Sequence, residues 1–287
     1  MKSNSKIIEE ASNIKLDERS RDLRKLILRA FKNSGKGHVG SAFSMLEIMR
    51  VLYDSILNYE NEDPSYPDRD RLIISPGWAS LAQFALLADK HFFEKSLLST
   101  FMNLDSPLGG CSEELVPGVE ATTGACGHGL SIGIGMALSL KLQGKNNCNV
   151  FVVLGDGEHG EGSVWEAAIS ASKNGLNNLV IIIDYNKVQC SGPVKSLTSL
   201  EPLADKWISF GMNVTEVNGH DVNELKKILA SLSKQRDKVN VLICHTVMGK
   251  GITFGEDTAD WHWKGKLDEE TINQMYDSIE GYKCEND

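Results

Sequence analysis

The sequence has no Cys-x-x-Cys pair, no long apolar run and no excess of positive charge. The longest apolar runs, Val150–Leu154 and Leu179–Ile183, have the length of strands, whereas a bilayer span needs about 20 apolar residues. The amino-terminal residues are too polar for a secretory signal. Asp and Glu (39) outnumber Lys and Arg (30), and the resulting charge of −9 disfavours nucleic acid and anionic membranes as partners.

The cysteines are scattered along the chain. This scatter favours reduced thiols in a cytoplasmic protein over a disulfide framework or a zinc site. The six cysteines are Cys111, Cys126, Cys148, Cys190, Cys244 and Cys284.

The length of 287 residues and the hydrophobic fraction of 41% favour one large α/β domain over residues 1–287, opening with a polar lead-in at 1–20. Continuous apolar runs at Asn149–Leu154 and Asn178–Asp184 flank a helical stretch, Ser163–Lys173, which is typical of a buried parallel sheet. We therefore expect a doubly wound parallel sheet that binds its ligands at the carboxyl ends of the strands. The other expected strands are Leu72–Ser75, Asn213–Val217 and Val239–His245, and the other expected helices are Leu23–Phe31, Ser44–Leu57, Ala79–Asp89, Leu130–Gln143, Glu201–Phe210 and Asn223–Leu232.

The most informative segment is VFVVLGDGEHGEGSVWEAA (150–168), a strand followed by a glycine-rich turn and a helix. It contains the G-x-G-x-x-G spacing of dinucleotide-binding proteins, but Asp156 and Glu158 stand inside the turn and Glu161 follows it. Carboxylates repel a diphosphate unless a cation lies between them. This turn therefore predicts a metal-bridged diphosphate rather than a bare dinucleotide.

A second group of oxygen ligands follows the next strand. Asn186 stands thirty residues after Asp156, and the carbonyl of Val188 lies two residues further on. Because parallel strands end at the same edge of a sheet, we expect these groups to meet there. Carboxylate, amide and carbonyl oxygens suit Mg²⁺, which also takes phosphate oxygens and water.

A G-D-G turn followed after about thirty residues by Asn resembles the thiamine diphosphate-binding motif. Further stretches resemble the amino-terminal half of transketolases, so that the similarity extends from about residue 20 to 270. They are SGKGHVGSAFSMLEI (34–48), DRDRLIIS (68–75), PGVEATTGACGHGLSIGIGMAL (117–138), NKVQCSG (186–192), NGHD (218–221), MGKGITF (248–254) and ADWHWKG (259–265). The chain is therefore identified as the amino-terminal subunit of a split transketolase.

The resemblance implies thiamine diphosphate- and magnesium-dependent transfer of a two-carbon ketol unit from a ketose phosphate donor to an aldose acceptor. It implies that Asp156, Asn186 and the Val188 carbonyl bind Mg²⁺, or Ca²⁺ or Mn²⁺ in its place. It assigns the remaining cofactor contacts to Gly157 and Glu158 in the diphosphate turn, to Gly124, Ala125 and Cys126 along the rings, and to His262. The implied catalytic residues are His38 and His262 at the substrate and Glu161 at the contact with the partner.

The family activates the cofactor with a glutamate of its other domain, which would lie after the point where this chain ends. The resemblance thus implies that the chain is inactive alone. It needs a separate carboxyl-half subunit, the pyrimidine-side domain, and an α2β2 heterotetramer is the expected assembly.

Three positions depart from the family pattern, two of them in the substrate pocket. Trp78 and Cys111 stand where the family has histidines, and Cys126 replaces a leucine. A site that lacks a partner for a substrate hydroxyl discriminates between substrates differently. We therefore expect a donor or acceptor other than the usual pentose phosphates.

Three alternatives stay open at this point. The same metal motif occurs in the α-type subunit of thiamine-dependent 2-oxo acid dehydrogenases, although the SGKGHVGS loop (34–41) and the WHWKG segment (261–265) argue against it. Acyl transfer from pyruvate is a second thiamine chemistry. A degenerate regulatory or scaffolding relative is the third, but every metal position is filled.

Overall fold

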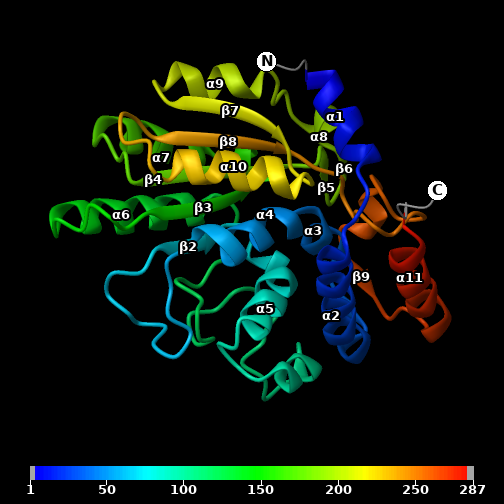
Figure 1. Ribbon diagram of the computed structural model, residues 1–287. Coiled ribbons are helices and arrows are strands. Elements are labelled where there is room, and N and C mark those ends of the chain that lie inside the picture. Colours follow the sequence, from blue (N-terminus) through cyan, green and yellow to red (C-terminus); the bar gives the residue numbers. More distant parts are fainter. Residues whose placement is uncertain (1–3, 283–287) are drawn as a thin grey trace.

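The computed structural model describes residues 4–282 and is built around a five-stranded sheet (Figure 1). The strand order is β2-β3-β4-β8-β7, and every pair of neighbours is parallel. The strands are β2 (Arg71–Ile74), β3 (Val150–Gly155), β4 (Leu179–Tyr185), β7 (Asn213–Asn218) and β8 (Asn240–His245). This arrangement confirms the predicted doubly wound sheet.

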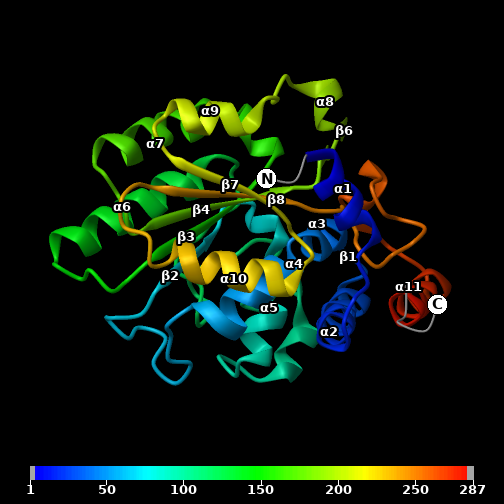
Figure 2. The ribbon, with the colours of Figure 1, turned by 45° about the horizontal axis from the view of Figure 1, so that its top comes forward.

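Helices cover both faces of the sheet (Figure 2). Along β4, the side chains of Val180 and Ile182 face one layer and those of Ile181 and Ile183 face the other, as the two-residue period of a strand requires. One layer contains α6 (His128–Leu142), α7 (Gly162–Lys173) and α9 (Leu203–Ser209). The other contains α2 (Glu18–Ser34), α3 (Val39–Ser44), α4 (Leu46–Val51), η1 (Leu52–Ile56), α5 (Ser80–Asp89), η3 (Lys95–Thr100), α10 (Val222–Leu232) and α11 (Glu269–Gly281).

The structure differs from the expected elements at both ends of the chain. The stretch expected as a polar lead-in contains helix α1 (Asn4–Asn13), whose Ile7 and Ala11 are buried and which packs beside β7. The predicted helix at Ser44–Leu57 is divided at Met45 and ends in a π-helical turn. Helix α11 is not expected from the sequence.

Loops after the strands all gather at the carboxyl edge of the sheet. Residues 75–79, including η2 (Gly77–Ala79), follow β2, and η4 (Gly157–Gly160) follows β3. A hairpin of β5 (Val188–Gln189) and β6 (Gly192–Pro193), continued by α8 (Val194–Leu197), follows β4.

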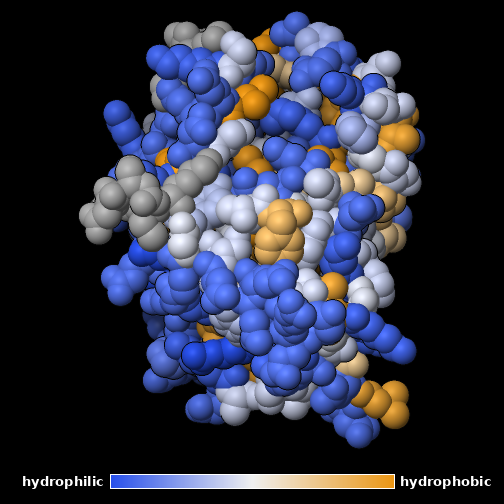
Figure 3. Space-filling model, turned by 90° about the vertical axis from the view of Figure 1, so that its right-hand side faces the viewer, coloured by the Kyte–Doolittle hydropathy of each residue, from blue (hydrophilic) through white to orange (hydrophobic). Residues whose placement is uncertain are grey.

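A short antiparallel pair, β1 (Lys36–Gly37) and β9 (Lys264–Gly265), completes this edge. Figure 3 views the molecule from the side on which β9 and α11 lie, where hydrophilic residues predominate and apolar ones are scattered between them.

Two further predictions can be checked on the described part of the chain. None of its helices is long and apolar enough to cross a membrane. Its five cysteines form no disulfide, and Cys284 lies outside the described residues.

Candidate active site

A cavity of about 410 Å³ opens at the carboxyl edge of the sheet. It is lined by residues from the loops after β2, β3 and β4, from the segment after β8 and from the start of α3. Nine of the residues predicted from the sequence line it together. They are His38, Cys126, Asp156, Gly157, Glu158, Glu161, Asn186, Val188 and His262.

Asp156 follows β3 and is 2% exposed. Its Oδ2 atom accepts a hydrogen bond from the backbone N–H of Lys187 at 2.6 Å, which joins the two strand-end loops. Burial, and then the nearby carboxylate of Asp184, raise the pKa of Asp156 to about 8. Two buried carboxylates in one cavity wall form a place where a divalent cation would be strongly favoured.

The side-chain amide of Asn186 is held at both ends. Its Nδ2 group donates to Ser44 Oγ at 3.0 Å and to Asp184 Oδ2 at 3.1 Å. Its Oδ1 atom accepts from the backbone N–H of Val188 at 2.9 Å, which leaves one lone pair of that oxygen for another partner.

The donor set fits a magnesium ion with a bound diphosphate. Three kinds of oxygen are offered by Asp156, Asn186 and the Val188 carbonyl. Residues 4–282 contain no cluster of three His, Cys, Asp or Glu side chains that could hold a metal by themselves, so a metal here would need other ligands as well. Mg²⁺ bound by one or two side chains keeps positions for phosphate oxygens and water.

Gly157 lies close to the side chain of Gln189 in the hairpin after β4. A Cβ atom there would lie 2.9 Å from Oε1 and 3.1 Å from Cβ of Gln189. The glycine thus lets the turn after β3 lie directly against the hairpin after β4.

The carboxylate of Glu158 is occupied by donors from three loops. It accepts from Ser75 Oγ at 2.5 Å and from the backbone N–H groups of Gly127 and Gly155, each at 2.8 Å. Burial raises its pKa. Glu158 lines the cavity, and its bonds tie the loop after β2 and the start of α6 to the turn after β3.

Four rings form one wall of the cavity. The antiparallel pairing of Gly37 with Lys264 brings His38 beside the segment that carries His262. The rings of His38 and His262 are 5.4 Å apart in an edge-to-face arrangement, and the Trp78 ring lies 6.1 Å from His38 and 6.2 Å from His262. Trp263 lies 6.3 Å from His38.

Burial in this wall favours neutral imidazoles. It lowers the pKa of His38 to about 4, with a further contribution from His262, and it also lowers the pKa of His262. The Nδ1 atom of His262 is buried and has no hydrogen-bond partner among residues 4–282.

The loop around Gly124 contributes less to the cavity than predicted. Cys126 lines it, whereas Gly124 and Ala125 are absent from the lining. A Cβ atom at Gly124 would lie 3.2 Å from the sulfur of Cys111. Burial, and then the charges of Glu158 and Glu161, raise the pKa of the Cys126 thiol to about 11, which suits packing rather than nucleophilic attack.

Glu161 stands apart from the buried residues. It is exposed, lines the cavity from the entrance of α7 and occupies the N-cap position of that helix.

Three residues of the site are not predicted from the sequence. Asp184 and Trp263 line the cavity, but no role is predicted for them from the sequence. His159, also given no role, donates a hydrogen bond from Nδ1 to the carbonyl of Gly155 at 2.9 Å and so holds the end of β3 before the glycine-rich turn.

Residues 17–286 match a protein-family model described as the thiamine diphosphate binding domain of transketolase. The match defines the class of protein as a thiamine diphosphate-binding domain. Because it covers more than half of the chain, the chain belongs to the transketolase family.

Two relatives share nearly their whole length with the chain. It is 35% identical over 274 residues to one of the named subunits of the apulose-4-phosphate transketolase from Phocaeicola vulgatus, covering 94% of this chain and 97% of that protein. It is 35% identical over 258 residues to the 6-deoxy-6-sulfo-D-fructose transketolase subunit SqwG of a Clostridium species, covering 90% and 93%. These similarities confirm the resemblance to amino-terminal subunits of split transketolases.

The fold is also that of solved transketolases. The structure from Leishmania mexicana superposes with a TM-score of 0.84 at 28% identity, and it covers 98% of this chain. The structure from Campylobacter jejuni gives the same score and identity. The chain spans 42% and 43% of those two longer chains.

Proposed function

We propose that the chain is the diphosphate-binding subunit of a two-chain transketolase, which transfers a two-carbon ketol unit from a ketose donor to an aldose acceptor. The proposal depends on one observation above all. Asp156, Asn186 and Val188 line the same cavity as His38 and His262, which lie more than 70 positions away from them in the sequence. The proposed metal ligands and proton-transfer groups would thus share the carboxyl edge of the sheet.

Asp156, Asn186 and the Val188 carbonyl would hold Mg²⁺, with Ca²⁺ or Mn²⁺ able to replace it. Gly157 and the bonded carboxylate of Glu158 would shape the turn beside the diphosphate, and Gly124, Ala125 and Cys126 would border the rings. When bound, thiamine diphosphate supplies the carbanion-stabilising chemistry of ketol transfer.

His38 and His262 would orient the substrate and move its protons. A neutral imidazole can accept a proton at one nitrogen and donate one at the other, so the lowered pKa of each ring suits this role near pH 7. Their edge-to-face contact and the indole of Trp78 hold the two rings in fixed relative positions.

A separate carboxyl-half subunit would complete the site, in an α2β2 heterotetramer. The relative from Phocaeicola vulgatus is itself named as one subunit of its transketolase. Helices α6 and α7 pack together and leave large apolar side chains exposed, with Leu142 at 80% and Ile169 at 57%. The exposed Glu161 at the cavity rim begins α7, so its carboxylate is available to such a partner.

The substrates would differ from the usual pentose phosphates. Trp78 places a large ring in the cavity wall where the family has a histidine, and Cys111 lies behind Gly124 rather than in the wall. By the family pattern, the imidazole missing at Trp78 would lie near the diphosphate, and the one missing at Cys111 would lie at the donor's hydroxyls. The two relatives named above carry apulose-4-phosphate and 6-deoxy-6-sulfo-D-fructose in their names, which supports a non-standard donor. The free cysteines support a reducing, cytoplasmic setting.

Calorimetric titration of thiamine diphosphate and Mg²⁺ into the chain mixed with a carboxyl-half subunit tests the cofactor role. Asp156→Asn should weaken Mg²⁺ binding at least tenfold. Asp70→Asn is the matched control, because Asp70 is also buried but accepts backbone N–H bonds from Asn58 and Asn149 at the opposite end of the strands. Equal effects of the two variants on Mg²⁺ affinity would refute the assignment, and a screen of ketose and 2-oxo acid donors then identifies the reaction.

A further inference from the structure

Asp184 forms the centre of a buried polar network behind Asn186. It lies in β4, two residues before Asn186, and is 2% exposed. Its Oδ1 atom accepts from the hydroxyls of Ser44 at 2.8 Å and Thr246 at 2.5 Å. Its Oδ2 atom accepts from Asn186 Nδ2 at 3.1 Å.

This arrangement, together with the Val188 N–H that donates to Oδ1, determines which end of the Asn186 amide turns toward the cavity. The two ends of an amide have nearly the same shape, but one only donates hydrogen bonds and the other only accepts them. The carboxylate of Asp184 can only accept, so it selects the NH₂ end and directs Oδ1 away from itself. Only Oδ1 can bind a metal.

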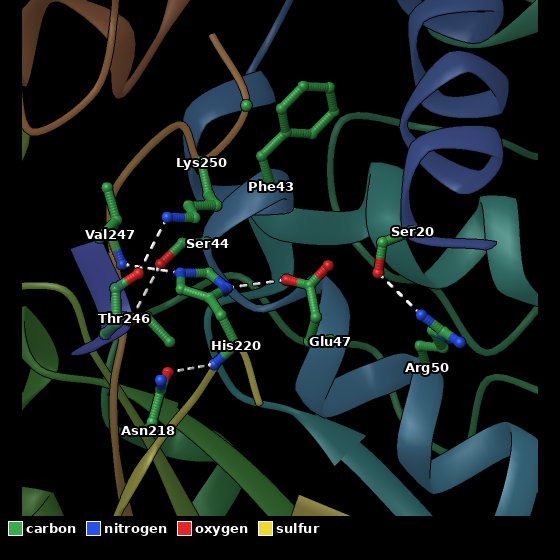
Figure 4. A network of polar contacts seen from close by, with 12 residues as sticks. Ser20, Phe43, Ser44, Glu47, Arg50, Asn218, His220, Thr246, Val247 and Lys250 are labelled. Atoms are coloured by element: carbon green, nitrogen blue, oxygen red, sulfur yellow. Dashed lines mark hydrogen bonds and ion pairs between the residues drawn. The ribbon is translucent and has the colours of Figure 1, made fainter. Parts of the chain in front are cut away.

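A second layer holds the segment that carries Thr246 (Figure 4). The backbone N–H of Val247 donates to His220 Nε2 at 2.9 Å, so the proton of this imidazole is on Nδ1, which donates to Glu47 Oε2 at 2.8 Å. Glu47 also accepts two hydrogen bonds from Arg24, at 2.6 and 3.0 Å. The loop after β8 is thereby fastened to α2 and α4.

We propose that Asp184 is a positioning residue for the metal site and acts through the amide of Asn186. Ser44 and Thr246 hold the Asp184 carboxylate, and the layer of Glu47 and His220 holds Thr246. This inference rests on the proposed function, because it takes Asn186 as a ligand of a divalent cation. It predicts an effect on the choice of metal as well as on affinity.

The relative affinity for Mg²⁺ and Ca²⁺ is the decisive readout. In Asp184→Asn an NH₂ group facing that of Asn186 would push the Asn186 amide away, leaving the Val188 N–H alone to hold it, so Oδ1 would be displaced from the metal. Mg²⁺ demands nearly ideal octahedral geometry, whereas Ca²⁺ tolerates a changed ligand set. Loss of charge alone would weaken both divalent ions to a similar degree.

The experiment titrates Mg²⁺ or Ca²⁺ calorimetrically into the full chain with its carboxyl-half partner and saturating thiamine diphosphate. Asp184→Asn should weaken Mg²⁺ binding by about tenfold or more, which is within the range known for residues that hydrogen-bond to metal ligands. The same variant should weaken Ca²⁺ binding distinctly less. Thr246→Val, which keeps the charge of Asp184 and removes one of its donors, should shift the ratio of the two affinities in the same direction by a smaller factor.

Asp70→Asn serves as the control for loss of a buried carboxylate and should leave the Mg²⁺/Ca²⁺ ratio unchanged. Equal weakening of both ions by Asp184→Asn, or no weakening of either, would overturn the positioning role. A wild-type complex that binds neither ion with thiamine diphosphate would instead refute the proposed function itself.

Discussion

The burial of His159 predicts that the free energy of unfolding falls as the pH is lowered. Its ring is buried against Trp165 and Trp207, with ring centres 5.5 and 5.7 Å away. The Nε2 atom is buried without a hydrogen-bond partner among the described residues. Burial lowers the pKa of His159 to about 4, despite the bond between Nδ1 and the Gly155 carbonyl.

The size of the effect follows from proton linkage. The unfolded chain protonates His159 below pH 6.5, whereas the folded chain keeps it neutral down to about pH 4. The unfolded state therefore binds more protons in this window, and the free energy of unfolding falls as the pH falls. The difference between 6.5 and about 4, at 1.36 kcal/mol per pH unit, is about 3 kcal/mol.

Urea unfolding at a series of pH values between 4 and 8 measures this contribution. His159→Leu should be less stable at pH 7 by about 1–3 kcal/mol, because the Gly155 carbonyl loses its partner. As the pH falls from 6 to 5, the free energy of unfolding of this variant should fall by about 1.2 kcal/mol less than that of the wild type.

Trp165→Phe is the matched control for this experiment. It removes the indole N–H bond to the His159 carbonyl from the same cluster but no titrating group. Its stability should drop by about 1 kcal/mol at every pH, with an unchanged pH dependence. If His159→Leu shows the wild-type pH dependence, the buried neutral imidazole is not the cause of acid sensitivity.

Three further perturbations test separate parts of the molecule. Arg24→Ala should cost about 3–5 kcal/mol in urea unfolding, because it leaves the carboxylate of Glu47 buried without its cation; a loss below 1 kcal/mol would contradict this. Trp78→His should shift kcat/KM toward linear pentose phosphates by about tenfold, and an unchanged preference would remove Trp78 from substrate selection. Gly157→Ala should weaken thiamine diphosphate binding several-fold, whereas Gly160→Ala, with open space around its Cβ, should not.

The sheet could be predicted because its central strands are buried on both sides. The apolar runs at Asn149–Leu154 and Asn178–Asp184 coincide with β3 and β4 to within a residue. The place of the expected metal ligands could be predicted from the same strands, because Asp156 and Asn186 come directly after them.

The wall of four rings around His38 and His262 could not be predicted from the residues alone. It depends on the pairing of β1 with β9, two strands of two residues each that lie more than 200 positions apart. Strands this short carry no periodic pattern. Helix α1 is hard to detect for a related reason, since only Ile7 and Ala11 of its ten residues are buried.

The hydrogen bonds of individual polar side chains also could not be predicted from the sequence. The sequence places Glu158 beside the diphosphate, yet its carboxylate is bonded to Ser75, Gly127 and Gly155. Such bonds depend on the meeting of three loops, which only the folded chain defines.

Ketol transfer by the purified chain, measured with and without a carboxyl-half subunit, tests the central claim most directly. Thiamine diphosphate, Mg²⁺ and a panel of ketose donors and aldose acceptors are supplied in both cases. We predict no turnover by the chain alone and turnover when the two polypeptides are mixed. Turnover by the chain alone, or none with any donor after mixing, would contradict the claim.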